Sequence, residues 1–223
     1  MIEIRNLSKS FGDRNLFNNI NINFYDNMTY SIVGESGSGK TTLLNIIAKL
    51  EEKDRGSIRY NSTDLDKINE QKFFRDYLGY LFQNLGLIES ASVDYNLDLA
   101  FVGKKLSKNE KLRLKKEALD KVNLSHINLN TKVYTLSGGE SQRVALSKLI
   151  LKDPPIILAD EPTASVDPMN AGEILNILLG MKRKDRIIII ATHSKDIWQA
   201  TDEVISIDEL KHTEQKQSIW KIN

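Results

Sequence analysis

A glycine-rich segment, GESGSGKT at residues 34–41, has the composition of a phosphate-binding loop. It follows the apolar run YSIV and opens the run TTLLNIIAKL, so it joins a predicted buried strand to a predicted helix. Glycines let backbone N–H groups turn inward around phosphate oxygens, and the helix start adds a partial positive charge. Lys40 has the length to reach the β- and γ-phosphates, and the Thr41 hydroxyl suits Mg²⁺. The sequence therefore predicts a phosphate site rather than an empty turn.

Two adjacent carboxylates, Asp160 and Glu161, stand at the end of the buried strand predicted from PIILAD. Desolvating a carboxylate costs several kcal/mol unless a cation offsets its charge, so packing alone rarely explains such a pair. We predict that Asp160 holds Mg²⁺ through water. Glu161 is expected to point toward the cleft where an attacking water would lie.

His193 follows a third apolar run, IIIIAT, at a strand end, where ligands of open α/β sheets bind. A lone histidine is more often a core or loop residue, but the two other strand ends favour a donor to the γ-phosphate. Gln83 follows one more apolar strand, in GYLFQN, and its amide is suited to complete the Mg²⁺ shell or to position water. His126 and His212 lie on polar stretches without metal-ligand spacing, and we assign them no role.

A second pair of glycines, Gly138 and Gly139, begins a predicted helix, although glycine weakens helices. Ser137 and Glu140 match a capping box, which explains the helix start but not the glycines. Bare N–H groups at a helix start form a second anion site. If a helical segment holds this site away from the chain's own phosphate loop, the anion must belong to a nucleotide on another copy.

The apolar pattern predicts strands of two kinds. Ile2 and Ile4 alternate with polar residues, as do Ile20, Ile22 and Phe24, which indicates half-buried antiparallel strands. The continuous runs YSIV, PIILAD and IIIIAT indicate strands of a parallel sheet covered on both faces. Strand alternating with helix implies a doubly wound α/β layer. The predicted helices are Lys40–Leu50, Lys108–Val122, Glu140–Leu151, Ala171–Met181 and Lys195–Ala200.

Residues 84–136 show helical patterns without strands, which predicts an inserted helical lobe. Within it, the lysine-rich stretch at 104–121 also contains acidic residues and an apolar stripe, so a solvated helix face is favoured over contact with lipid headgroups. In the polar C-terminal tail, Trp220 is expected to be a packing anchor rather than a site residue.

Length, charge and apolar content limit which classes of protein this chain can belong to. With 223 residues the chain has room for one sizeable core, and 31 basic residues against 30 acidic ones give no general attraction to nucleic acid or anionic lipid. No cysteine is present, as is typical of a reducing cytosol. The first residues lack a signal-peptide pattern, and the longest apolar runs are far shorter than the roughly 18 residues that span a bilayer. A soluble chain is expected.

The segments GESGSGKT, FQN, LSGGESQR, ILADEPT, SVD and THS resemble the ATP-binding cassette (ABC) family and occur in that family's order. The resemblance implies one nucleotide-binding domain over residues 1–223. Its fold would be α/β, a P-loop NTPase (RecA-like) core with a mainly parallel sheet, an antiparallel β subdomain and the helical subdomain at 84–136. It also implies Mg²⁺-dependent ATP hydrolysis by a homodimer, in which two ATP molecules are held between head-to-tail cassettes.

The resemblance also implies a role for each matching residue. Phe11 would stack on adenine, where the family more often has tyrosine, and Asp167 would belong to a loop that couples the two sites. Glu161 would be the general base and His193 the γ-phosphate sensor. The phosphates would be wrapped by Gly34, Ser36, Gly37, Ser38, Gly39, Lys40, Thr41 and Thr42. Magnesium would be held by Thr41, Gln83 and Asp160, and ATP would be reached in trans by Ser137, Gly138 and Gly139.

The segment LGYLFQNLGLIESASVDYNLDLAF is similar to cassettes that serve lipoprotein release, macrolide export and bacteriocin or peptide-antibiotic export. This implies an export ATPase on the inner face of the cell membrane, bound to a separate permease. One alternative is a cassette that controls a cell-wall hydrolase or a sensor without transport. Another is a soluble cassette of translation or DNA repair, although those usually carry two cassettes or long insertions. A GTPase is disfavoured because the chain has no Asn-Lys-x-Asp motif.

Overall fold

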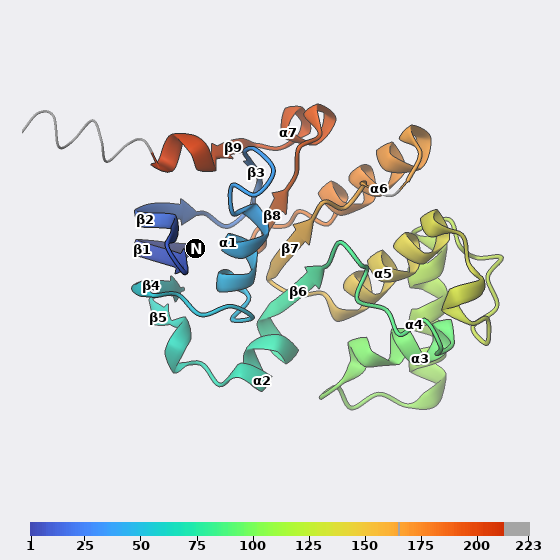
Figure 1. Cartoon of the computed structure of the whole chain (residues 1–223). Coiled ribbons are helices and arrows are strands. Elements are labelled where there is room, and N and C mark those ends of the chain that lie inside the picture. Colours follow the sequence, from blue (N-terminus) through green and yellow to red (C-terminus); the bar gives the residue numbers. More distant parts are fainter. Residues whose placement is uncertain (165, 212–223) are drawn as a thin grey trace, which may run out of the picture.

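Two β-sheets and a group of helices build the chain, whose computed structural model describes residues 1–164 and 166–211. Figure 1 shows the antiparallel sheet at one side, the parallel sheet in the middle and the helical lobe at the other side. The predicted anchor Trp220, His212 and the serine of the SVD motif, Ser165, lie outside the described residues.

The parallel sheet carries the site, and its strand order is β6-β7-β8-β3-β9. All its strand pairs run parallel, and every residue of β7 and β8 is buried. The continuous apolar runs therefore gave the correct prediction of covered, parallel strands. The bounds are β3 (Met28–Val33), β6 (Leu78–Leu81), β7 (Ile156–Asp160), β8 (Ile187–Ala191) and β9 (Glu203–Ser206).

The second sheet is antiparallel, in the order β2-β1-β4-β5. Ile2 pairs with Phe24 and Ile4 with Ile22, so the alternating isoleucines lie on the same buried face, as predicted. Its strands are β1 (Ile2–Phe11), β2 (Arg14–Phe24), β4 (Arg55–Tyr60) and β5 (Thr63–Asp64).

Helix α1 (Lys40–Ile47) lies between the two sheets in Figure 1 and buries Leu43, Leu44 and two isoleucines. It ends before the predicted Leu50 because Lys49 adopts a left-handed backbone, with φ of 62°. Helix α6 (Pro168–Gly180) begins three residues earlier than predicted, at a proline, which favours the first helical position. The shorter helical elements are α7 (Lys195–Ala200), as predicted, α2 (Glu70–Lys72), a 3₁₀ turn (Leu65–Lys67) and a π-helical turn (Phe73–Tyr77).

The helical lobe, residues 84–136, contains helices and no strand, and its one β-bridge joins Ser92 to Lys132. It packs on α5 (Gly138–Lys152) through a second hydrophobic core, separate from the core around α1. Lys115 departs from the predicted solvated face, since it is only 3% exposed and its Nζ contacts Asp94 Oδ1 at 2.6 Å and Asp98 Oδ1 at 3.0 Å. The helical elements of the lobe are α3 (Val93–Asp98), α4 (Lys108–Asp120) and 3₁₀ turns at Leu99–Phe101 and Val133–Thr135.

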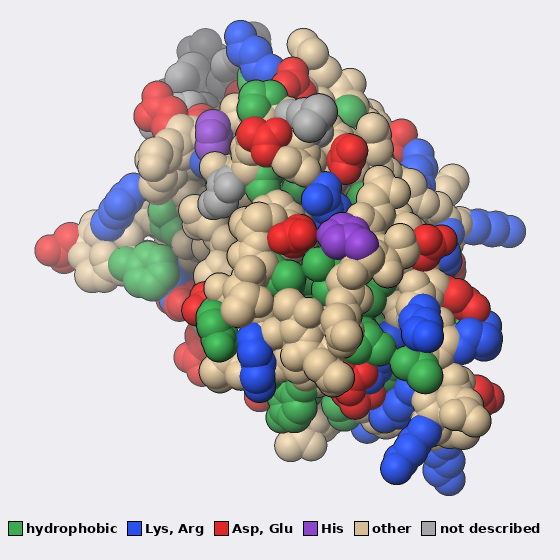
Figure 2. Space-filling view, turned by 90° about the vertical axis from the view of Figure 1, so that its right-hand side faces the viewer, with side chains coloured by type: hydrophobic (Ala, Val, Ile, Leu, Met, Phe, Trp, Pro, Cys, Tyr) green, Lys and Arg blue, Asp and Glu red, His purple; other side chains and the backbone are tan. Residues whose placement is uncertain are grey.

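The surface carries both signs of charge. Over the described residues of the face in Figure 2, acidic and basic side chains are interspersed, in keeping with the formal net charge of +1. Within residues 1–164 and 166–211, none of the helices combines the length and the apolar character needed to cross a bilayer.

Candidate active site

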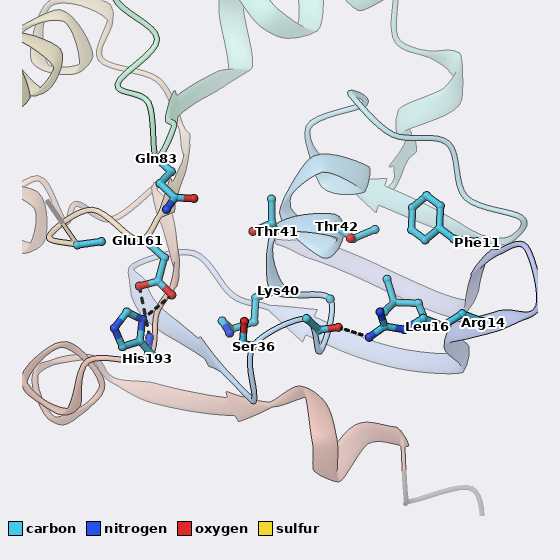
Figure 3. A pocket seen from close by; sticks show the side chains of 13 residues that line it. Phe11, Arg14, Leu16, Ser36, Lys40, Thr41, Thr42, Gln83, Glu161 and His193 are labelled. Carbon is cyan, nitrogen blue, oxygen red and sulfur yellow. Dashed lines mark hydrogen bonds and ion pairs between the residues drawn. The ribbon is translucent and has the colours of Figure 1, made fainter.

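A cavity of about 600 Å³ opens where β3, β6, β7 and β8 end. Figure 3 shows that side chains from the antiparallel sheet, the glycine-rich loop and the strand ends face this one space. Residues far apart in the sequence therefore form a single site. The lining residues are Phe11, Arg14, Leu16, Ser36, Gly37, Gly39, Lys40, Thr41, Thr42, Gln83, Glu161, Ala164 and His193.

The glycine-rich loop connects β3 to α1, as the sequence predicts. Gly39 has φ of +111°, and a Cβ atom there would lie 2.7 Å from the Phe17 ring, so only glycine fits. Ser38 is 6% exposed, and its hydroxyl has no hydrogen-bond partner among the described residues. Gly34 and Ser38, which were also predicted to bind phosphate, do not line the cavity.

Lys40 lies at the mouth of the loop, where its Nζ donates to the carbonyl oxygens of Gly34 at 2.9 Å and Glu35 at 3.2 Å. The ammonium is therefore tethered by two neutral acceptors of the loop backbone. A lysine held in this way keeps its positive charge available for phosphate oxygens that enter the loop.

Thr41 and Asp160 meet at the loop end of the sheet, where Thr41 Oγ1 donates to Asp160 Oδ1 at 3.2 Å. Asp160 is 4% exposed. Burial raises the pKa of the Asp160 carboxyl, and the charge of Glu161 adds to the rise, whereas the Thr41 hydrogen bond and Lys40 lower it. A cation close to Asp160 would favour its ionised form.

The donor set fits Mg²⁺. Thr41 offers a hydroxyl, Asp160 a carboxylate and Gln83 an amide oxygen, all hard oxygen donors. In the described part of the chain, no group of three or more His, Cys, Asp or Glu side chains could hold a metal alone. Mg²⁺ is commonly bound by one or two protein groups and substrate phosphates, so phosphate oxygens would complete a magnesium shell here.

Glu161 and His193 form a pair beside the cavity. Glu161 Oε1 lies 2.9 Å from His193 Nδ1, and Oε2 lies 3.4 Å from both Thr192 Oγ1 and the His193 N–H. The Glu161 backbone has φ of 47°, a conformation that a residue with a Cβ adopts at a cost of about 1–3 kcal/mol. Its N–H donates to the carbonyl of Ala191, the last residue of β8, at 2.9 Å, which ties the strained residue to the neighbouring strand.

Gln83 and Phe11 lie at opposite ends of the lining in Figure 3. Gln83 is exposed and faces the side of the cavity that holds Glu161. Phe11 is 48% exposed, and the Lys9 ammonium lies 4.6 Å from its ring centroid. An exposed aromatic ring at the rim offers a stacking surface for a planar base.

Comparison with known protein families matches residues 17–164 to the ABC transporter family. This range is about two thirds of the chain and includes the glycine-rich loop, Gln83, the capping box and both carboxylates. The chain belongs to the ABC transporter family. It is the ABC ATPase subunit of a transporter, its fold class is the one predicted, and its enzymatic activity is ATP hydrolysis.

Several relatives share most of this cassette. The phosphonates import ATP-binding protein PhnC of Fusobacterium nucleatum is 34% identical over 93% of this chain and 88% of its own length. The macrolide export ATP-binding/permease protein MacB of Campylobacter jejuni is 32% identical over 93% of this chain, which spans only 33% of MacB. The ATP-binding cassette MJ0796, solved as a dimer bound to ADP and Pi, matches with a TM-score of 0.83 and 28% identity, over 92% of this chain and 94% of that one.

Three cavity residues of the cassette were missed by sequence reasoning: Arg14, Leu16 and Ala164. Arg14 Nη2 donates to the Gly37 carbonyl at 2.8 Å, so it contacts the phosphate loop directly. Arg14 lies in the segment FGDRN, and no motif in that segment points to the loop. Ala164 lies in the turn after the two carboxylates, a position that a wider reading of ILADEPT could have included.

The Ser-Gly-Gly segment begins α5 and has the predicted capping box. Ser137 Oγ accepts from the Glu140 N–H at 3.2 Å, and Glu140 Oε2 accepts from the Ser137 N–H at 2.9 Å. Glutamate thus serves as the second residue of the capping box. Ser137, Gly138 and Gly139 do not line the cavity, and Figure 1 shows α5 on the side of the helical lobe.

Asp167, the last predicted site residue, also lies outside the cavity lining. Its Oδ1 accepts from the Asn170 N–H at 3.1 Å, and Arg143 of α5 donates to Asn170 Oδ1 at 2.7 Å. A Cβ added at Gly139 would lie 3.4 Å from Asn170 Cγ. The loop of Asp167 is therefore connected to the start of α5 by hydrogen bonds and close packing.

Replacing Gly39 with alanine is expected to weaken ATP binding and to lower the urea midpoint of unfolding. The left-handed backbone costs about 1–3 kcal/mol with a Cβ present, and the Phe17 ring blocks the new atom. Gly103→Ala is the matched control. Gly103 lies in the lobe, away from the phosphate loop, its φ is +83°, and the new Cβ would meet the side chain of Arg75. It should lower the midpoint without changing ATP affinity, and equal losses of affinity would contradict the role of the loop.

Proposed function

We propose that this ABC ATPase drives export of a bacteriocin, peptide antibiotic or lipid-linked substrate through a separate permease at the inner face of the cell membrane. The observation that carries the proposal is the convergence of Lys40, Asp160, Glu161 and His193 at one edge of the parallel sheet. Export is supported by MacB among the relatives and by the likeness of residues 78–101 to export cassettes. PhnC, an import protein, makes direction of transport the point to test.

The cavity residues have the arrangement that phosphoryl transfer needs. Loop N–H groups and Lys40 would bind the β- and γ-phosphates, with the adenine stacked on Phe11. Thr41, Asp160 and Gln83 are the proposed protein ligands of Mg²⁺, which when bound would neutralise charge on the phosphates. Lys40 would exchange its contacts with the loop carbonyls for phosphate oxygens, since both lie within reach of one ammonium.

Glu161 is the proposed general base, which takes a proton from the attacking water. His193 Nδ1 lies 2.9 Å from the carboxylate and holds it in place, while Nε2 remains the ring atom for the γ-phosphate. The backbone strain at Glu161 supports this role, because such strain is concentrated at functional sites.

We also propose that the working form is a homodimer that holds ATP between the cavity of one copy and Ser137, Gly138 and Gly139 of the other. These residues form the start of α5, are exposed or half-buried, and do not line the cavity of their own chain. Such a start attracts anions. The relative MJ0796 was solved as a dimer, which supports the same assembly here.

The permease is proposed to bind a groove of about 540 Å³ beside the helical subdomain, residues 84–136. The groove exposes Val102 and Leu99, with relative exposures of 61% and 36%, and Phe74 and Lys152 also line it. Exposed apolar side chains in a concave surface suit a short amphipathic helix. The groove lies between the lobe and the segment that precedes β6. Strand β6 ends at Leu81, two residues before Gln83, so we expect docking in the groove to shift Gln83 in the active site.

To test the proposal, the Glu161→Gln protein would be tagged in its native cell, trapped with Mg·ATP and purified with its membrane partner. We expect a polytopic permease in stoichiometric amount, and ATP-dependent flux of a peptide or lipid-linked substrate when wild-type protein and permease are reconstituted. A copurified permease without flux would instead favour a regulatory cassette. Recovery of soluble or ribosomal partners alone would overturn the membrane assignment.

A Val102→Asp variant, which places a charge in the proposed groove, should lose the permease but keep ATP binding.

A further inference from the structure

The outer face of the phosphate loop is held by three charged side chains, Arg14, Asp208 and Lys211, which we call the loop clamp. Lys211 Nζ donates to the Ser38 carbonyl at 2.7 Å, and Asp208 Oδ2 accepts from the Glu35 N–H at 3.1 Å. Arg14 donates to the Gly37 carbonyl at 2.8 Å. Each clamp residue therefore contacts a different backbone group of the loop.

The topology explains why residues 207–211 reach the loop. Strand β9 pairs in parallel with β3, and Ser206 lies beside Val33, so both strands end at the same edge. The loop follows β3, and helical residues 207–211 follow β9. Ile207 is fully buried and fixes the start of this helical segment. The Lys211 ammonium also lies 6.0 Å from the centroid of Phe17, the ring that packs against Gly39.

A loop that turns its N–H groups inward around phosphate must turn carbonyl groups outward. Two cations of the clamp, Arg14 and Lys211, receive the carbonyls of the consecutive residues Gly37 and Ser38. Burial lowers the pKa of the Lys211 ammonium, which Arg14 lowers further, whereas Asp208 opposes this shift. The negative charge of Asp208 thus favours the charged form of the Lys211 ammonium at the loop.

We propose that Asp208 and Lys211 are positioning residues that hold the phosphate loop in its ATP-binding shape before ATP arrives. The inference rests on the proposal that ATP phosphates bind this loop. A preformed loop loses less conformational freedom on binding, so affinity rises without a new contact to the ligand. Asp208 and Lys211 do not line the cavity, whereas Arg14 does. Only Asp208 and Lys211 therefore give a test that leaves direct ATP contacts unchanged.

The test compares Lys211→Met and Asp208→Ala with the conservative variants Lys211→Arg and Asp208→Asn, which keep a donor and an acceptor. Wild-type protein and each variant would be assayed for ATP hydrolysis and, without ATP, for hydrogen exchange of amides 34–39. Lys184→Met is the matched control, because Lys184 is exposed in the turn before β8.

We expect Lys211→Met and Asp208→Ala to raise KM for ATP by about 5- to 30-fold with a much smaller change in kcat. Loop amides should exchange faster, and the two conservative variants should restore both readouts. Unchanged KM and unchanged exchange in both truncated variants would overturn the clamp. If Lys211→Arg and Asp208→Asn raised KM and amide exchange as much as Lys211→Met and Asp208→Ala, a role for these hydrogen bonds would also be overturned. Wild-type protein that binds no ATP would instead overturn the proposed function.

Discussion

Glu161→Gln is expected to lower ATP turnover by about 10²- to 10⁴-fold, the range for a lost general base, while ATP binding persists. The amide has the shape of the carboxylate but cannot accept the proton of the attacking water. Its carbonyl oxygen can still accept from His193 Nδ1, which lies 2.9 Å from Oε1 in the wild-type protein. The strained backbone is kept, because the new side chain has the same branching.

The measurement is phosphate release at saturating Mg·ATP, together with binding of a fluorescent ATP analogue. Glu35→Gln is the matched control, since Glu35 is an exposed acid of the phosphate loop and contacts Lys40 and Asp208 through its backbone. It should retain near-wild-type turnover. Unchanged turnover in Glu161→Gln would remove Glu161 from the mechanism.

Gly139→Asp is expected to reduce ATP turnover by about 10²-fold or more, in the range for a lost oxyanion donor, with ATP affinity of the single chain unchanged. A carboxylate at the start of α5 would face the γ-phosphate held by the other copy and repel it. The fold should tolerate the side chain, because the new Cβ would lie 3.4 Å from Asn170, an ordinary contact distance.

Gly180→Asp is the control for this substitution, because Gly180 is exposed at the end of α6 and no atom lies within 4 Å of its added Cβ. Its turnover should stay close to that of the wild-type protein. Both variants would be compared by phosphate release and by ATP binding at low protein concentration. Loss of ATP affinity in Gly139→Asp would mean that α5 acts on its own chain's cavity.

The sequence predicted the parts of the site that follow local rules. The loop at 34–41 and the carboxylates at 160–161 each follow an apolar strand, and parallel strands bring such ends to one edge. The cap at Ser137 could be predicted because it depends on a residue three positions later. In these places the chemistry and the secondary structure are coded by the same few residues.

Other features depend on contacts between distant segments. Lys211 reaches Ser38 across 173 positions, and Asp208 reaches Glu35 across the same separation, so no local pattern marks them. The burial of Lys115 depends on Asp94 and Asp98, which belong to another helix of the lobe. Strand β4 was not predicted, because only Ile58 and Tyr60 are buried in it.

Sedimentation of the Glu161→Gln protein with and without Mg·ATP tests the central claim most directly. If ATP is held between the cavity of one copy and the start of α5 of another, ATP should convert a single chain into a dimer. Adding Gly139→Asp to Glu161→Gln should abolish that conversion. A Glu161→Gln protein that binds ATP and stays a single chain would contradict the claim, as would a double variant that still dimerises.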